Sequence, residues 1–60
     1  MPLQYSAYLI ATNGDVIDRI ELVFDSEDEA KARARQLVTP RQAVELWQSN
    51  AFIERFLPPD

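Results

Sequence analysis

Apolar and polar side chains alternate along residues 3–12 and again along residues 15–24. Such alternation is typical of strands that bury only one face. Between the two runs stands Asn13-Gly14, a dipeptide that favours the positive φ values of a type I′ turn. The pattern therefore predicts a β-hairpin over residues 3–24 with a two-residue turn.

A two-residue turn fixes which residues lie opposite one another, and hence which side chains share a face of the hairpin. One face is then almost entirely apolar, and we expect it to form the core. The other face is mixed. The predicted core face pairs Ala11 with Val16, Leu9 with Asp18, Ala7 with Ile20, Tyr5 with Leu22 and Leu3 with Phe24. The mixed face pairs Thr12 with Asp15, Ile10 with Ile17, Tyr8 with Arg19, Ser6 with Glu21 and Gln4 with Val23.

Residues 26–38 are predicted to form a helix. Ser26 is a good N-cap, and Glu29, three residues later, completes a capping box. An apolar stripe at helical spacing is expected to face the sheet, and its two alanines allow a close approach. Pro40 then stops the helix. The stripe consists of Ala30, Ala34, Leu37 and Val38.

Two further strands are predicted at residues 42–48 and 51–57, around Ser49-Asn50. This turn lacks glycine, and two registers remain open. A two-residue loop places Glu45 opposite Glu54, whereas a three-residue loop places Glu45 opposite Arg55 and removes the like-charge contact. The partner of Trp47 changes with the register, from Phe52 to Ile53.

These elements predict an α+β fold of the form ββαββ: a four-stranded, mainly antiparallel sheet with one helix packed on one face. We expect the strand order 2-1-3-4, because it makes every neighbouring pair antiparallel. Val44 and Leu46 share a face in either register, and we place that face under the helix. Residues 1–60 then form a single domain, made of hairpin 3–24, helix 26–38 and hairpin 42–57.

The chain has 60 residues, a net charge of −4, and neither cysteine nor histidine. An acidic balance argues against nonspecific binding to nucleic acid or to an anionic membrane. Without cysteine, neither a disulfide nor a thiolate metal site supplements the core, and a chain this short then needs a partner subunit or an unusually good core. We expect a cytoplasmic protein, because no apolar run approaches the ~20 residues of a membrane span and the N-terminus lacks a signal sequence.

Five short motifs are distributed over residues 4–56: Tyr5-Ser6-Ala7-Tyr8, Asn13-Gly14, Arg19-Ile20-Glu21-Leu22, the helix end Arg35-Gln36-Leu37 and Val44-Glu45-Leu46-Trp47-Gln48. Together they resemble a family of short bacterial proteins of unknown function. The resemblance implies a small cytosolic bacterial protein. It implies no activity and carries no catalytic residue onto this chain.

Groups that suit catalysis or metal binding are sparse. The acidic run at residues 25–29 lacks the ligand spacing and the glycine of a calcium loop, and helix capping accounts for it. Glu45 and Glu54 would form a carboxylate pair of the kind that glycosidases use, but a domain this small offers little room for a closed pocket. Gly14 is a single glycine, and phosphate loops need several. We therefore expect no enzymatic activity, no metal and no cofactor.

One helix can cover only one side of the sheet. The other side presents apolar and aromatic side chains, and contiguous patches of this kind usually mark an interface. We expect Arg19 over the Tyr8 ring as a cation–π contact. In the alternative interpretation, the long side chains of Arg19, Arg55, Gln4 and Gln48 cover the patch. The candidate interface residues are Tyr8, Ile10, Ile17, Arg19, Val23 and Trp47, with Phe52 or Ile53 beside Trp47.

Two functional hypotheses follow. The first is a non-enzymatic interaction module that forms a two-fold homodimer through the helix-free sheet face or a sheet edge, or that pairs with another small protein. The second is a binding module for an anionic ligand, such as RNA or a small metabolite, that uses the aromatic face together with Arg19, Lys31, Arg33 and Arg55. Nucleic acid is disfavoured by the net charge of −4.

Overall fold

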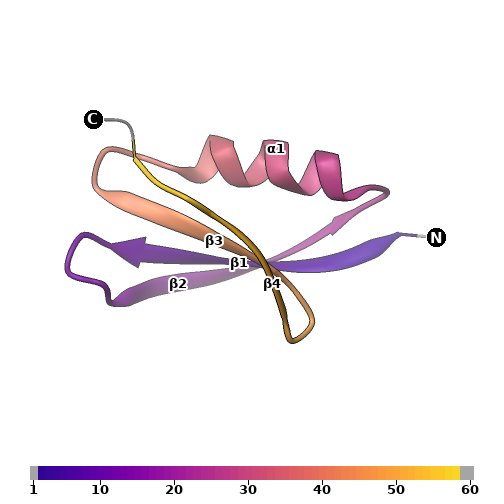
Figure 1. Ribbon diagram of the computed structural model, residues 1–60, viewed down its shortest axis with the longest axis horizontal. Helices are drawn as coiled ribbons and strands as arrows, with labels where there is room; N and C mark the ends of the chain where they lie inside the picture. Colours follow the sequence, from indigo (N-terminus) through magenta and orange to yellow (C-terminus); the bar gives the residue numbers. More distant parts are fainter. Residues whose placement is uncertain (1, 59–60) are drawn as a thin grey trace.

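The computed structural model describes residues 2–58; Met1, Pro59 and Asp60 lie outside the described part. Four strands form one sheet in the order β2-β1-β3-β4, and every neighbouring pair is antiparallel. The single helix, α1, covers one face of this sheet (Figure 1). The predicted ββαββ fold and its strand order are confirmed. The elements are β1 (Leu3–Ala11), β2 (Val16–Phe24), α1 (Glu27–Leu37), β3 (Gln42–Gln48) and β4 (Ala51–Phe56).

Both ends of α1 are capped by side chains. Ser26 has an extended backbone, and its Oγ accepts a hydrogen bond from the N–H of Glu29 at 3.3 Å, as the capping motif predicts. At the other end, Gln42 Nε2 donates to the carbonyl oxygen of Leu37 at 2.9 Å. This bond satisfies one of the carbonyls that a helix leaves free in its last turn. The predicted range 26–38 matches the helix with its two cap residues.

The core lies between α1 and the sheet, and it is small. Ala30 and Ala34 of the helix are fully buried, as is Ala7 of β1. These small side chains allow the helix to approach the sheet closely. The buried core residues are Tyr5, Ala7, Ala30, Ala34, Val44, Leu46 and Phe56, with Leu9, Ile20, Leu22, Phe24, Leu37, Val38 and Ile53 packed against them.

The first hairpin follows the predicted register over seven residue pairs, as far as Leu9. Beyond Leu9 the register shifts by one residue. Ile10 lies opposite Val16, and Ile17 becomes the extra residue of a β-bulge. The predicted pairing of Ile10 with Ile17 is therefore wrong.

The shift begins at the turn, which has three residues rather than two. The N–H of Gly14 donates to the carbonyl oxygen of Ala11 at 2.9 Å, and the N–H of Ala11 donates to that of Asp15 at 2.8 Å. Gly14 has φ 93°, but Asn13 does not have the positive φ that a type I′ turn requires. The predicted turn type is wrong because an Asn-Gly pair serves equally well in a three-residue loop with glycine in the left-handed position.

The bulge also corrects the predicted core face. Val16, expected opposite Ala11 in the core, instead lies opposite Ile10, and its side chain is 59% exposed. Asp18 is exposed too, and Leu3 at the other end of the hairpin is 36% exposed. The apolar pairs between these ends follow the prediction.

The second hairpin combines the two registers that the sequence left open. Next to the turn, Trp47 lies opposite Phe52, as a two-residue loop requires. Farther from the turn, Glu45 lies opposite Arg55, as a three-residue loop would place it. A second β-bulge reconciles the two registers, and Ile53 is its extra residue.

The second turn lacks the glycine that the first one has. Ser49 has φ 53°, the only positive φ among the described residues other than glycine. Backbone in this region is strained for a residue with a Cβ atom. The strand β4 ends at Phe56, one residue before the predicted end.

We predict opposite effects on stability for glycine substitutions at the two turns. Gly14→Ala should lower the free energy of unfolding by about 1–2 kcal/mol, because alanine is strained at positive φ. The added Cβ would have no heavy atom within 4 Å, so no steric clash contributes. Ser49→Gly should leave stability unchanged or raise it by up to about 1 kcal/mol. Urea denaturation followed by circular dichroism measures both, and destabilisation by Ser49→Gly equal to that by Gly14→Ala would contradict this account.

A second prediction concerns the Tyr5 hydroxyl. Tyr5 is 1% exposed, and its Oη has no hydrogen-bond partner among the described residues. Burying such a group unpaired costs about 1–3 kcal/mol. Tyr5→Phe should therefore keep or raise the free energy of unfolding, whereas Tyr8→Phe, at a half-buried ring, should change it by less than about 0.5 kcal/mol. Thermal denaturation decides, and a marked loss of stability in Tyr5→Phe would count against an unpaired hydroxyl.

Candidate functional site

The side of the sheet away from α1 is the candidate site, and we call it the helix-free face. It lies below the sheet in Figure 1, opposite the helix. Its residues alternate along the strands with those of the core. The helix-free face comprises Gln4, Ser6, Tyr8, Ile10, Val16, Arg19, Glu21, Val23, Ala43, Glu45, Trp47, Phe52 and Arg55.

Three aromatic side chains form a row across this face. The ring centroids of Tyr8 and Trp47 are 6.2 Å apart with an interplanar angle of 81°, and those of Trp47 and Phe52 are 5.4 Å apart at 72°. Edge-to-face contacts of this kind contribute about 0.5–1.5 kcal/mol beyond burial. Tyr8 and Trp47 are half-buried, whereas Phe52 is 52% exposed. The row therefore ends in a ring that projects into solvent.

A polar cluster borders the Tyr8 end of the row. The guanidinium carbon of Arg19 lies 5.7 Å from the centroid of the Tyr8 ring, which confirms the predicted cation–π contact. Arg19 Nη2 also lies 2.6 Å from a carboxylate oxygen of Glu21. The hydroxyl of Ser6 and the amide of Gln4 both donate to Glu21 at 3.3 Å. The cluster covers part of Tyr8 and leaves no net charge on this end of the face.

A second ion pair lies in the middle of the face. Arg55 donates to Glu45 through Nε at 2.8 Å and through Nη2. Trp47 Nε1 donates to the other carboxylate oxygen of Glu45 at 3.3 Å. The Glu45 side chain is only 13% exposed, whereas that of Arg55 is 57% exposed. Arg55 thus neutralises Glu45 and does not cover the aromatic row.

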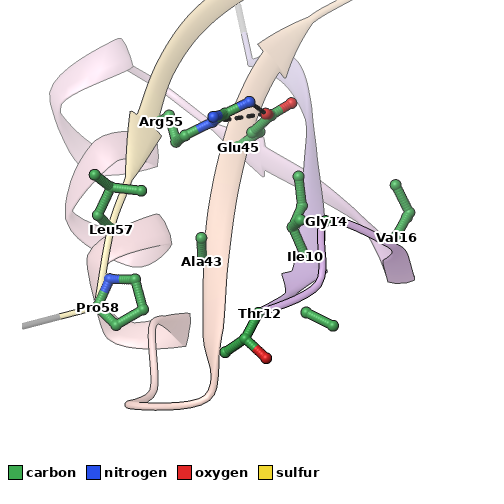
Figure 2. Close-up of a pocket in the computed structure, with 10 residues that line it drawn as sticks. Ile10, Thr12, Gly14, Val16, Ala43, Glu45, Arg55, Leu57 and Pro58 are labelled. Carbon is green, nitrogen blue, oxygen red and sulfur yellow. Dashed lines mark hydrogen bonds and ion pairs between the residues drawn. The ribbon is translucent and has the colours of Figure 1, made fainter.

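A shallow hollow of about 610 Å³ occupies the other end of the face. Ala43 lies on β3 between Ile10 of β1 and Leu57, which follows β4 (Figure 2). Val16 borders the same space, and its side chain is 59% exposed. We call this space the hollow. The hollow forms over Ala43 because this residue has the smallest side chain of β3.

The structure brings together four of the six predicted interface residues. Tyr8, Ile10, Arg19 and Trp47 all lie on the helix-free face, and side-chain contacts join Arg19, Tyr8 and Trp47 in one row. Val23 is on the same face but at its far end, opposite Gln4. Ile17 is 56% exposed at the bulge and has no partner residue on β1.

Sequence reasoning missed Val16, Ala43 and Leu57. Val16 was assigned to the core because the bulge was not foreseen. Ala43 and Leu57 become significant only when three strands are placed side by side. The available signal was the Thr12-Asn13-Gly14 sequence, which also fits a three-residue loop.

Three of the four basic residues of the second hypothesis are in ion pairs. Lys31 lies 3.4 Å from Glu27 and 3.6 Å from Glu54. Arg33 donates to Gln36 at 3.0 Å. The ion pairs of Lys31, Arg19 and Arg55 offset three of the four positive charges that an anionic ligand would need, whereas Gln36 is neutral and leaves the charge of Arg33 in place. No contact within residues 2–58 favours that hypothesis.

The carboxylate pair considered from the sequence does not form. Glu54 lies opposite Leu46 on the helix side of the sheet, whereas Glu45 lies on the helix-free face. Within the described residues, no group of three or more carboxylates is arranged to hold a metal ion. In the same part of the chain, the helix is neither long nor apolar enough to cross a membrane.

Comparison with protein-family models, curated proteins and solved structures finds no match to this chain.

The half-buried position of Glu45 leads to a prediction about its charge. Glu45→Gln should lower the free energy of unfolding by about 1–3 kcal/mol, because Arg55 then loses a charge-assisted bond. Glu21→Gln is the matched control, since the Glu21 side chain is 47% exposed and its ion pair is solvated. That change should cost less than about 1 kcal/mol. Chemical denaturation of both variants tests the difference. An equal loss of the free energy of unfolding in the two variants would show that burial does not strengthen the Glu45–Arg55 pair.

Proposed function

We propose that this protein is a small, non-enzymatic interaction module that self-associates as a homodimer through its helix-free face. The observation that carries the proposal is the exposed apolar surface on a face whose ion pairs cancel. Phe52 is 52% exposed and Val16 59%, beside the half-buried Tyr8 and Trp47. Aromatic residues and arginine are the types enriched in interface hot spots.

Charge favours a second copy as the partner. Arg19 and Arg55 offset Glu21 and Glu45, so the helix-free face is neutral. The net charge of −4 arises from residues elsewhere in the chain. Two copies that approach through their neutral faces avoid like-charge contacts at the interface.

The small core also favours association. Three of the seven buried core residues are alanine, and cysteine is absent from the sequence. A domain of about 60 residues buries only about 60% of the surface of its unfolded chain. Covering a second face adds apolar burial that one helix does not supply. Dimerisation thus supplies the stabilisation that larger domains obtain from their cores.

The helix-free face is better suited to this contact than a sheet edge. The two edge strands are β2 and β4, and each contains a β-bulge. A bulge interrupts the regular row of hydrogen-bonding groups that an added strand would need. We infer, further, a cytoplasmic location, with which the absence of cysteine is consistent.

Solution mass tests the proposal. At high micromolar concentration, sedimentation equilibrium should give about twice the 6.9 kDa of one chain. Val16→Asp should shift the protein to monomer, because it would bury an unpaired carboxylate in an apolar part of the contact. The control is Arg33→Asp, which also introduces a carboxylate but on the exposed side of α1, away from the helix-free face. It should leave the dimer intact. A monomer at every concentration, combined with amide shifts on β1 and β2 upon addition of an oligonucleotide at low salt, would favour the anionic-ligand hypothesis instead.

A further inference from the structure

We propose that the dimer is held by two reciprocal contacts, in which Phe52 of each copy inserts into the hollow of the other. This inference rests on the proposed self-association and specifies its geometry. It assigns Phe52 as the inserted residue and Ala43 as the floor that receives it. The occupant of the hollow is therefore a second copy of this chain.

The projecting part is the tip of the second hairpin. The turn between β3 and β4 extends away from α1, on the helix-free side of the sheet (Figure 1). Phe52 follows this turn and is 52% exposed. Its ring is held edge-to-face against Trp47, with centroids 5.4 Å apart. A partly immobilised ring loses little further conformational entropy when it enters a partner.

The receiving part is the hollow at the other end of the face. Its volume of about 610 Å³ accommodates an aromatic ring. Figure 2 shows Ala43 between Ile10 and Leu57, with the Glu45–Arg55 pair at one end of the space. Two apolar side chains of the wall are exposed, Val16 at 59% and Leu57 at 68%, whereas Thr12, Glu45 and Arg55 supply its polar part. An aromatic ring that enters this space removes apolar surface of both partners from water.

The two parts are positioned for exchange by a two-fold axis. Ala43, below the hollow, and Trp47, which supports Phe52, are four residues apart on β3. That separation is about 13 Å along a strand, and Glu45 lies halfway. An axis parallel to the sheets that crosses β3 near Glu45 brings each Phe52 over the partner's hollow. Both contacts form at once, as a two-fold interface requires.

Charge in the middle of this arrangement is balanced. Each copy brings one Glu45–Arg55 pair to the axis, so two carboxylates and two guanidinium groups meet there. Arg55 is the more exposed partner, with 57% of its side chain accessible, so it is the group of each pair that faces the other copy. The second copy thus meets complementary shape at the ends and complementary charge at the centre.

The surface of one chain is large enough for the contact. The described residues expose 4230 Å². A stable dimer of standard size buries about 800 Å² per partner, or about one fifth of that surface.

Size exchange between the two positions tests the inference. Phe52→Ala removes the inserted ring, and Ala43→Phe fills the hollow, so each should raise the dimer dissociation constant more than about tenfold. The double variant Phe52→Ala/Ala43→Phe places a ring where the cavity was and a cavity where the ring was. It should recover most of the lost affinity, and so should an equimolar mixture of the two single variants.

Ala32→Phe is the matched control, because it makes the same substitution as Ala43→Phe at an exposed position of α1, on the opposite side of the sheet. It should leave the dissociation constant unchanged. Far-UV circular dichroism establishes that each variant is folded. The wild-type protein provides an independent readout, because an isotope-filtered NOE experiment on mixed labelled and unlabelled chains should connect the Phe52 ring with the Ala43 methyl group between copies.

The outcomes separate this inference from the proposed function. A dimer in which Ala43→Phe and Phe52→Ala both retain wild-type affinity, or which lacks the intermolecular NOE, would overturn the inserted-ring geometry and leave self-association standing. A wild-type protein that stays monomeric at high micromolar concentration would overturn both. Recovery of affinity in the double variant, with the NOE present, establishes the geometry.

Discussion

Close contact between an alanine-lined helix and a four-stranded sheet is the constraint on which the rest of the structure depends. Ala30 and Ala34 allow α1 to pack near β1 and β3, where Ala7, Val44 and Leu46 are fully buried. A chain of 60 residues has length for one such helix. One face of the sheet is therefore sealed, and the properties of the other face follow from that asymmetry.

The helix-free face shows how a small protein distributes charge and apolar surface. Its arginines are matched by glutamates on the same face, while the acidic excess lies elsewhere. The aromatic side chains are braced by each other and by Arg19. These contacts restrict the rotamers of the aromatic side chains in the single chain. A surface prepared in this way favours one orientation of approach over nonspecific adhesion.

Much of the fold was predictable from the sequence, because alternation, capping and helical spacing are local signals. Ser26 as the N-cap, Ala30 and Ala34 as core residues, and the register as far as Leu9 all follow from such signals. The two bulges did not. They arise where the length of a turn and the register of the paired strands differ by one residue, and isoleucine is not a residue type that marks a bulge. The candidate site was predicted as a face, but the hollow around Ala43 needed three strands in place.

The extra isoleucines in both outer strands have a consequence for how far assembly can proceed. Ile17 and Ile53 each increase the local twist of a strand at the margin of the sheet. Neither margin then offers a straight ribbon onto which further chains can stack in register. Both edges thus disfavour the addition of further strands, while the helix-free face stays exposed. Under the proposed pairing of helix-free faces, assembly of this protein would end with two copies.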